Sequence, residues 1–219
     1  APFHYGASVS HLAIRSKVLL DKEMSYLFSK YGVANVPEAF VKKATGPEIE
    51  AMRALLEMGI DEGGLGIGVL LDYMSVAVSA DELRMIFEVA GKRNVPVTVH
   101  VRRGLPGDAA GLDEVIALAE QTGAPLLVCH ITHSAMQDVG KWLEKIDQAN
   151  ARGARITAET LTYAAGGTSI GAAVFGRDWQ RIFNISYGDV QWTATGEWLT
   201  KETFEKYRRE QPDGVINHH

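Results

Sequence analysis

The sequence lacks the marks of several protein classes. Cys129 is the only cysteine among 219 residues, so the chain forms no internal disulfide. No apolar run approaches the roughly 20 residues that a membrane span needs. The net charge of −5 disfavours a nucleic-acid or anionic-membrane partner. The N-terminal Ala-Pro-Phe-His carries neither an initiator methionine nor a signal-peptide pattern, as expected of a processed chain or an excised piece. The single cysteine and the absence of a signal pattern favour a cytoplasmic location.

What is present has ordinary globular proportions. Hydrophobic residues make up 46% of the chain and charged residues 22%, with 22 glycines and 7 prolines. These values exclude disorder, collagen and coiled coil. The length suffices for one large domain or two small ones. The terminal His218-His219 pair is either native or the remainder of a tag.

Helix and strand patterns alternate from residue 45 onward. Capping boxes begin helices at Thr45–Glu48 and Ser79–Glu82. We expect helices at 45–58, 79–90, 111–121 and 134–152, and strands at 65–71, 95–100, 124–130 and 155–161. The strands recur about every 30 residues, the length of one βα unit. They are continuous apolar runs, which predicts a parallel sheet covered on both faces.

The two ends of the chain are less regular. In residues 1–44 we expect a strand at 5–12, a helix at 18–31 and a loop at 32–45. In residues 164–219 we expect a loop at 166–171, irregular or short-stranded structure at 172–199, a helix at 200–210 and the start of a strand at 215–216. Three tryptophans of this region, Trp179, Trp192 and Trp198, are expected to cover apolar surface or to wall a pocket.

This count gives five βα-type strands and a sixth at the very end. An eight-stranded (βα)8 TIM-like barrel needs about 250 residues. We therefore expect an α/β fold in which residues 1–219 form a single, incomplete barrel domain of five to six strands. The rival is a complete five-stranded doubly wound sheet that binds a nucleotide or another small molecule. That alternative leaves residues 164–219 without a clear role.

Two histidines terminate two successive predicted strands. His100 and His130 lie 30 residues apart in sequence, one βα repeat. Neighbouring parallel strands lie about 4.8 Å apart, and their carboxyl ends share the rim where βα folds build active sites. Two imidazoles at matched height there can bind one metal ion, most plausibly zinc. The alternative is a pair of histidines that hydrogen-bond the backbone at strand ends.

Other polar residues near this rim have two interpretations each. Glu159 and Tyr163 lie where the last clear strand ends, and there they can contact a substrate or a metal-bound water, or Glu159 can pair with Arg155 or Arg102. His133 lies in the next loop and is expected to be solvated rather than bound to substrate. Cys129 is expected to behave as a small buried apolar residue.

The glycine run at residues 63–68 resembles a phosphate-binding loop. A nucleotide fingerprint needs a strand before the glycines and a helix directly after them. Here the glycines lie inside the predicted strand, and the next helix opens only near Ser79. Close packing of the strand is therefore the favoured interpretation.

Several motifs also occur together in a familiar order and spacing. They are Val97-Thr-Val-His100-Val-Arg102, Cys129-His130, the stretch from Ile156 through Glu159 and Tyr163 to Ser169, and, in support, Ser10-His11 to Arg15, Gly64–Gly68 and Asp72-Tyr73. This set resembles the amidohydrolase superfamily, in its branch of N-acyl-D-amino-acid deacylases, including the N-acyl-D-glutamate type. The similarity covers essentially the whole chain, which looks like the third-to-seventh-strand portion of the family barrel.

The resemblance implies a metal-dependent hydrolase that cleaves N-acyl-D-amino acids or related amides through a metal-activated water. It implies that His100 and His130 are metal ligands for one or two zinc ions. It assigns Tyr163 to stabilisation of the oxyanion, and Arg102 and Ser169 to substrate contacts. The expected partner is a small-molecule substrate, with a homo-oligomer possible and no nucleic acid or membrane.

The sequence departs from the family pattern in several places. The first-strand His-x-His pair, the second-strand cysteine ligand and the eighth-strand aspartate base have no counterpart in this chain. Thr132 occupies the place of a common lysine, and Leu161-Thr162 replaces Tyr-Pro. We therefore expect this chain alone not to complete the metal site. The alternative function is a catalytically incomplete fragment or a non-catalytic α/β domain that acts through oligomer or partner contacts.

Overall fold

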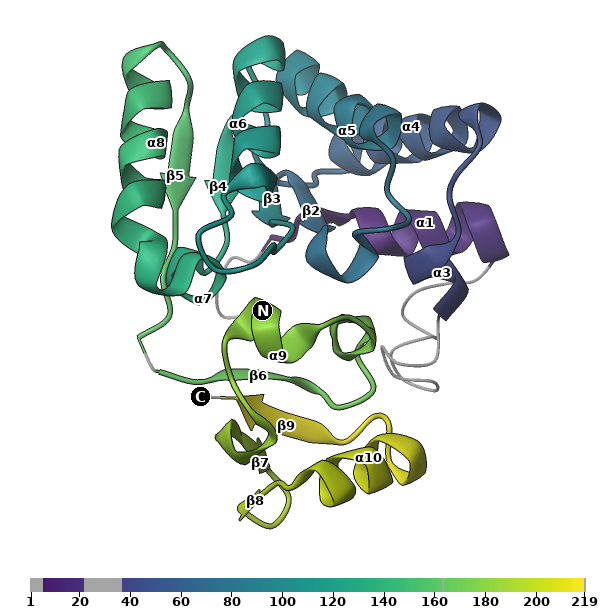
Figure 1. Cartoon of the computed structure of the whole chain (residues 1–219). Helices are drawn as coiled ribbons and strands as arrows, with labels where there is room; N and C mark the ends of the chain where they lie inside the picture. The colour runs from purple at the N-terminus through teal and green to yellow at the C-terminus, as the bar shows by residue number, and fades with distance from the viewer. Residues whose placement is uncertain (1–5, 22–36, 163, 219) are drawn as a thin grey trace, which may run out of the picture.

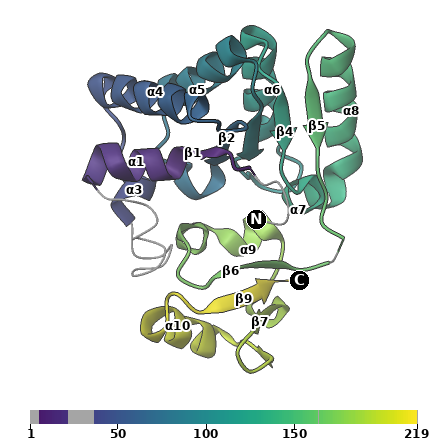
Figure 2. The same cartoon turned by 180° about the vertical axis from the view of Figure 1, so that it is seen from behind.

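Two β-sheets organise the computed structural model, which describes residues 6–21, 37–162 and 164–218 (Figure 1). One sheet has five parallel strands, and the other has four antiparallel strands. The smaller sheet lies below the carboxyl ends of the parallel strands, next to α7 (Ile131–Ala135) (Figure 2). The α/β class predicted from the alternating patterns is confirmed.

The parallel strands follow one another in chain order. Their order is β1-β2-β3-β4-β5, with bounds Val9–Ser10, Ile67–Leu70, Val97–His100, Leu126–Val128 and Ile156–Ala158. A doubly wound sheet reverses its strand order at the point where ligands bind. This sheet has no such reversal among its described strands, so its order is that of a barrel wall, and the doubly wound alternative is wrong.

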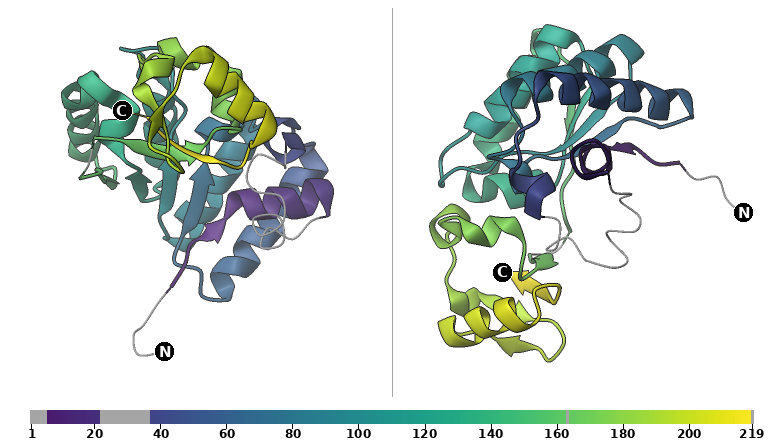
Figure 3. Two further views of the ribbon diagram at one scale, coloured as in Figure 1. Left: turned by 90° about the horizontal axis from the view of Figure 1, so that it is seen from below. Right: turned by 90° about the vertical axis from the view of Figure 1, so that its right-hand side faces the viewer.

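Helices cover one face of the parallel sheet. The longest are α4 (Gly46–Asp61), α5 (Ala80–Arg93), α6 (Ala110–Thr122) and α8 (Val139–Ala151), and Figure 3 shows them on one side of it. The Ser79 hydroxyl accepts a hydrogen bond from the Glu82 amide at the start of α5, as the capping box predicts. Gly123 ends α6 with a φ of 69°, the left-handed conformation that favours glycine.

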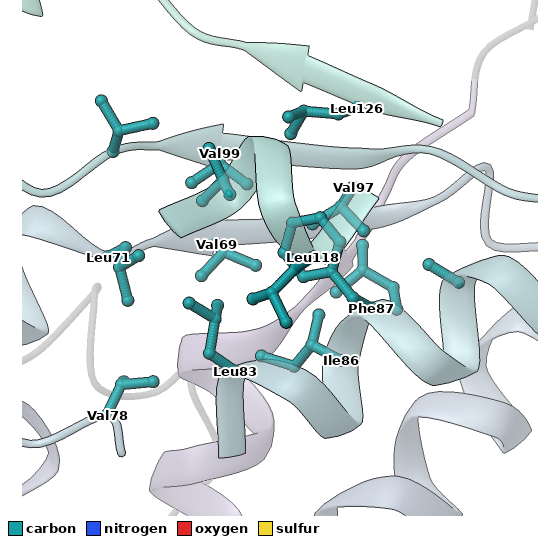
Figure 4. Close-up of a cluster of buried hydrophobic side chains, with 14 of the residues drawn as sticks. Val69, Leu71, Val78, Leu83, Ile86, Phe87, Val97, Val99, Leu118 and Leu126 are labelled. Atoms are coloured by element: carbon teal, nitrogen blue, oxygen red, sulfur yellow. The ribbon is translucent and has the colours of Figure 1, made fainter. Parts of the chain in front are cut away.

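The two faces of this sheet differ in burial. Val69, Val97 and Val99 lie beneath the helices in Figure 4, and they and Ile67 are at most 2% exposed. On the opposite face Thr98 is only partly buried, and Leu70 is 38% exposed. The prediction that both faces are covered is therefore wrong for the described residues. The reason is that glycine and threonine alternate with the large apolar residues, so only one face is continuously apolar.

The C-terminal region forms the second sheet. Its order is β6-β9-β7-β8, with bounds Gly166–Ser169, Val215–His218, Val190–Trp192 and Glu197–Trp198. Helices α9 (Trp179–Phe183) and α10 (Lys201–Glu210) accompany it. Trp179 and Trp192 are buried in its separate hydrophobic core, whereas Trp198 is 51% exposed.

Two predictions about this region need correction. The expected loop at 166–171 contains β6, because the Gly166–Ser169 backbone pairs with Val215–His218 despite its low strand propensity. The strand at 215–216 is real, but it lies between β6 and β7 in the antiparallel sheet and is no sixth parallel strand.

Some helix boundaries also differ from prediction. A helix α1 (His11–Leu20) begins seven residues before the expected start, with Ser10 as its N-cap. The expected loop at 32–45 holds α3 (Pro37–Val41). The expected helix at 134–152 divides into α7, a 3₁₀ turn at Met136–Asp138 and α8, because Met136 has a φ of 50°. Within the described ranges, no helix combines the length and apolar character that crossing a membrane requires.

Candidate metal and ligand site

Four histidines form a row between the two sheets. His100 ends β3, His130 follows β4, His133 lies in α7 and His218 ends β9. Successive ring centroids are 4.5, 5.6 and 4.7 Å apart. The predicted meeting of the His100 and His130 imidazoles at the carboxyl rim is therefore present, and two further imidazoles extend the row toward the smaller sheet.

Backbone geometry places these rings. The Cys129 amide donates to the Val99 carbonyl, which continues the parallel register to the residue before His130. His130 then takes a φ of 35°, a left-handed conformation that turns its side chain out of the strand direction. At the other end of the row, a Cβ atom on Gly166 would lie 2.4 Å from His133 Cε1 and 2.8 Å from His218. Glycine at 166 therefore gives these two rings their space.

Asp72 lies at the His100 end of the histidine row. Its carboxylate lies 3.7 Å from His100 Nε2 and accepts from Arg177 Nη2 at 2.9 and 3.0 Å and from the Arg103 amide at 2.9 Å. Burial raises the pKa of Asp72, but His100 and the Arg177 guanidinium outweigh it and hold that pKa below its usual value. Asp72 is thus a charged group that links the parallel region to the smaller sheet's region.

The imidazoles in the middle of the row are uncharged at neutral pH. Burial, with His100 nearby, lowers the pKa of His130 to about 4. Burial and the Arg103 charge lower the pKa of His133 to about 3. A neutral imidazole nitrogen is the form that binds a metal ion or accepts a hydrogen bond. Cys129 is not a thiolate, because burial and Glu159 raise its pKa to about 12.

The residues fit only part of a zinc site. Zinc in proteins takes three or four ligands, and His100 and His130 supply a close pair of imidazoles. Asp72, which lies beside His100, already binds Arg177 and the Arg103 amide. Across residues 6–21, 37–162 and 164–218, no group of three histidine, cysteine or acidic side chains is arranged to hold one ion.

The other predicted site residues lie in different surroundings. Arg102 donates to Glu114 at 2.9 Å and to the Val78 carbonyl at 2.8 Å, and it also bonds the Ser75 carbonyl. Ser169 ends β6, and its buried hydroxyl has no hydrogen-bond partner among the described residues. Tyr163 lies outside the described residues.

Sequence reasoning missed three members of this site. Asp72 stands in a motif that carries the family resemblance, but its role beside His100 depends on Arg177, 105 residues away in sequence. Arg103 stands next to Arg102, which the resemblance singles out, and its backbone amide binds Asp72. His218 belongs to the terminal pair that the sequence leaves open as native or the remainder of a tag. Only the pairing of β9 with β6 brings it to His133, and no sequence pattern predicts that pairing.

Two other motifs have structural roles. A Cβ on Gly66 would lie 2.5 Å from the Pro96 carbonyl oxygen, so the glycine run allows close packing, as expected. In the Ser10-His11 to Arg15 motif, His11 Nε2 lies 2.8 Å from Glu82 Oε1, and Arg15 Nη1 lies 2.5 Å from both Glu82 oxygens. All three side chains are fully buried. They form an ion network inside the parallel region, away from the histidine row.

Comparisons with known proteins agree with the motifs. No protein-family model matches the chain. The chain is 30% identical over 130 residues to an N-acyl-D-glutamate deacylase of Alcaligenes xylosoxydans xylosoxydans, which covers 55% of this chain and 26% of that protein. The matched stretch is therefore about a quarter of that relative's length.

Solved structures extend the match to most of the fold. A crystal structure of N-acyl-D-glutamate deacylase from Bordetella bronchiseptica, with zinc and a phosphonate inhibitor, aligns with a TM-score of 0.64 at 20% identity, over 94% of this chain and 50% of that one. A D-aminoacylase structure, described as defining a subset of amidohydrolases, aligns with a TM-score of 0.61 at 17% identity, over 84% of this chain and 41% of that one. The predicted resemblance to the N-acyl-D-amino-acid deacylase branch of the amidohydrolases is confirmed, over half or less of the relatives' length.

Proposed function

We propose that this chain supplies two metal ligands, His100 and His130, to a zinc-dependent hydrolase that cleaves the amide of N-acyl-D-amino acids. The observation that supports this proposal most directly is the 4.5 Å distance between the two ring centroids at the carboxyl ends of adjacent parallel strands. The sequence match to an N-acyl-D-glutamate deacylase supports the substrate class. A zinc ion held by imidazoles polarises a carbonyl group and acidifies water.

The chain's own residues have distinct roles in this proposal. His100 and His130 hold the metal as neutral imidazoles, and Asp72 fixes the position of His100 from behind. Tyr163 donates its phenol hydrogen to the developing oxyanion, a role typically worth about 2.7–4 kcal/mol. Ser169 offers a buried hydroxyl with no competing partner among the described residues. Arg102 contacts substrate only after its bonds to Glu114 and two carbonyls open.

Zinc content tests the ligand pair. In protein that contains this sequence together with the remaining ligands, we expect zinc to stay bound after dialysis against zinc and then metal-free buffer. His100→Asn and His130→Asn should each abolish retention. Asparagine tolerates the left-handed backbone at position 130, so this variant keeps the turn. His133→Asn is the matched control in the same row and should retain zinc. Equal retention by all three variants would exclude the proposed ligand pair.

Hydrolysis tests the reaction. Zinc-loaded protein that contains this sequence should release D-glutamate from N-acetyl-D-glutamate and leave the L-enantiomer intact. His100→Asn should reduce that rate by at least about 10²-fold, because the chemical step loses its electrostatic stabilisation. Undiminished turnover in this variant would contradict the proposal.

A second candidate is a non-catalytic α/β module that associates through the exposed face of the parallel sheet. The observation in its favour is the partial burial of Thr98 and the 38% exposure of Leu70 on that face. Light scattering of the zinc-free chain distinguishes the candidates. A concentration-dependent dimer that is lost in Leu70→Lys favours the module, whereas a monomer at every concentration counts against it.

A further inference from the structure

A pocket of about 290 Å³ lies at the His133–His218 end of the histidine row. Its polar wall is formed by Arg103, Thr132, His133 and His218. Its apolar wall consists of Met136, Leu161, Ala164, Ala165, Phe183 and Ile185. The pocket therefore combines one cationic side chain, two imidazoles and a hydroxyl with a short apolar surface.

Arg103 is the unusual member of this pocket. It is only 8% exposed, yet its guanidinium has no hydrogen bond or ion pair within the part of the chain that the structure describes. The nearby carboxylate, Asp72, accepts instead from Arg177 and from the Arg103 backbone amide. One buried carboxylate thus attracts two arginines, but it makes its direct ion pair with Arg177 and leaves the Arg103 N–H groups without a carboxylate acceptor. Burying a charged group without such a partner is costly.

The orientation of Arg103 leaves its donors available. Its guanidinium carbon lies over the Phe183 ring, 4.2 Å from the ring centroid, which is a cation–π contact. A cation–π contact occupies no hydrogen-bond acceptor, and among the described residues none accepts from the Arg103 side chain, so its N–H groups are available to a bidentate acceptor. Burial lowers the pKa of Arg103 to about 10, which still keeps it cationic at neutral pH.

The aromatic and imidazole rings next to the Arg103 guanidinium are held in place by close packing. Phe183 also stacks on His218 at a centroid distance of 5.5 Å, and His218 lies 4.7 Å from His133. Gly166 gives both imidazoles room, since a Cβ there would lie 2.4 Å from His133 Cε1. The pocket is thus built from both sheets and preorganised by close packing.

We propose that this pocket binds the carboxylate of a small organic acid with a short aliphatic chain. The Arg103 N–H groups hold the carboxylate, and His133 offers a further hydrogen bond. The Thr132 hydroxyl, which bonds the Thr160 hydroxyl at 2.8 Å, keeps one more hydrogen bond for the ligand. Leu161, Ala164 and Ile185 contact the aliphatic chain. The binding site itself stands on the pocket alone and requires no metal. The identification of its occupant with the carboxylate of an N-acyl amino acid rests on the proposed function.

The test uses 4-methylpentanoate and its neutral isostere 4-methylpentanamide. Calorimetric titration of the chain in excess chelator measures binding without any metal, so its outcome is independent of the zinc experiments above. We expect the carboxylate to bind at least about tenfold more tightly than the amide, the difference a charge-assisted bidentate pair supplies. Arg103→Gln should remove this preference, and Arg103→Lys should keep part of it, because lysine retains the charge without the fork.

The matched control is Arg181→Gln, an exposed arginine on α9, the helix that carries Phe183. It removes the same charge and should leave the preference unchanged. If Arg103→Gln does not fold, NMR spectroscopy follows the Arg103 Nε–H resonance of the unaltered chain during the titration. This resonance is assigned by its absence from the spectrum of Arg103→Lys. A saturable shift of this resonance with the carboxylate alone supports the pocket. Equal binding of carboxylate and amide, no binding of either, or an unchanged preference in Arg103→Gln overturns it.

Discussion

The parallel region and the antiparallel C-terminal region are built on different principles. In the former, each strand pairs with the next one in the chain, and the core lies between one sheet face and the helices that connect its strands. In the latter, β9 lies between β6 and β7, so the sheet depends on pairing between segments far apart in sequence. Local sequence periodicity therefore predicts the helices and strands of the parallel region, but it does not predict the strand pairing of the antiparallel region.

The candidate site lies where these regions meet. His100 and His130 come from the parallel region, whereas His218 and Phe183 come from the smaller one. Contacts across the boundary include the Asp72–Arg177 ion pair and a 3.3 Å hydrogen bond between Tyr73 and Thr168. Substitutions on either side therefore separate what each region contributes.

The largest expected effect is on the parallel region alone. Glu82→Ala leaves Arg15 as a buried, unpaired charge and should lower the free energy of unfolding by about 3–5 kcal/mol. Trp142, buried in this region's core, reports its unfolding in urea when the other tryptophans are replaced by phenylalanine. Glu88→Ala, an exposed ion-pair variant on the same helix, should cost at most about 1 kcal/mol. Equal costs for the two variants would show that the buried network does not stabilise the fold.

The next effect is on the boundary. Arg177→Met removes the main cationic partner of buried Asp72. A buried acceptor that loses its partner lowers the free energy of unfolding by about 1–3 kcal/mol, and a charged acceptor such as Asp72 lowers it by more. We expect the two regions to unfold less cooperatively, which separates the urea transitions of Trp142 and Trp179. Coincident transitions at an unchanged midpoint would show that this ion pair does not couple the regions.

Acid should weaken the parallel region through the same buried network. The pKa of Glu82 is held below its ordinary 4.5 because His11 and Arg15 outweigh the raising effect of burial, and burial lowers the pKa of His11 below 6.5. In both cases the unfolded chain binds more protons, so stability falls as pH drops below 6.5 and falls more steeply below 4.5. The thermal midpoint of the native chain should follow this slope. Glu82→Gln should flatten its acidic part, and an unchanged slope would exclude Glu82 as its source.

The smallest effect comes from one hydrogen bond across the boundary. Tyr73→Phe removes the bond to Thr168 Oγ1 and should lower stability by about 0.5–1.5 kcal/mol. Thr168→Val removes the same bond from the other side. The double variant should cost less than the sum of the single ones. Additive losses would mean that the two groups do not interact in solution.

Prediction from sequence succeeded where a local signal exists. The capping boxes at Thr45 and Ser79 and the glycine after α6 placed their helices to within a few residues. The strand ends placed His100 beside His130, because a regular βα repeat fixes the relative heights of neighbouring strands. Arg103, Arg177 and His218 could not be placed in this way, since their neighbours are set by long-range pairing and by the packing of Phe183.

The most direct test of the account is anomalous diffraction at the zinc edge from crystals of zinc-loaded protein that contains this sequence together with the remaining metal ligands. The account predicts a peak between His100 and His130, with one nitrogen of each imidazole about 2.0–2.1 Å from the ion. A peak bound by His133 and His218 instead, or no peak near the row at all, would contradict the assignment of His100 and His130 as the metal ligands.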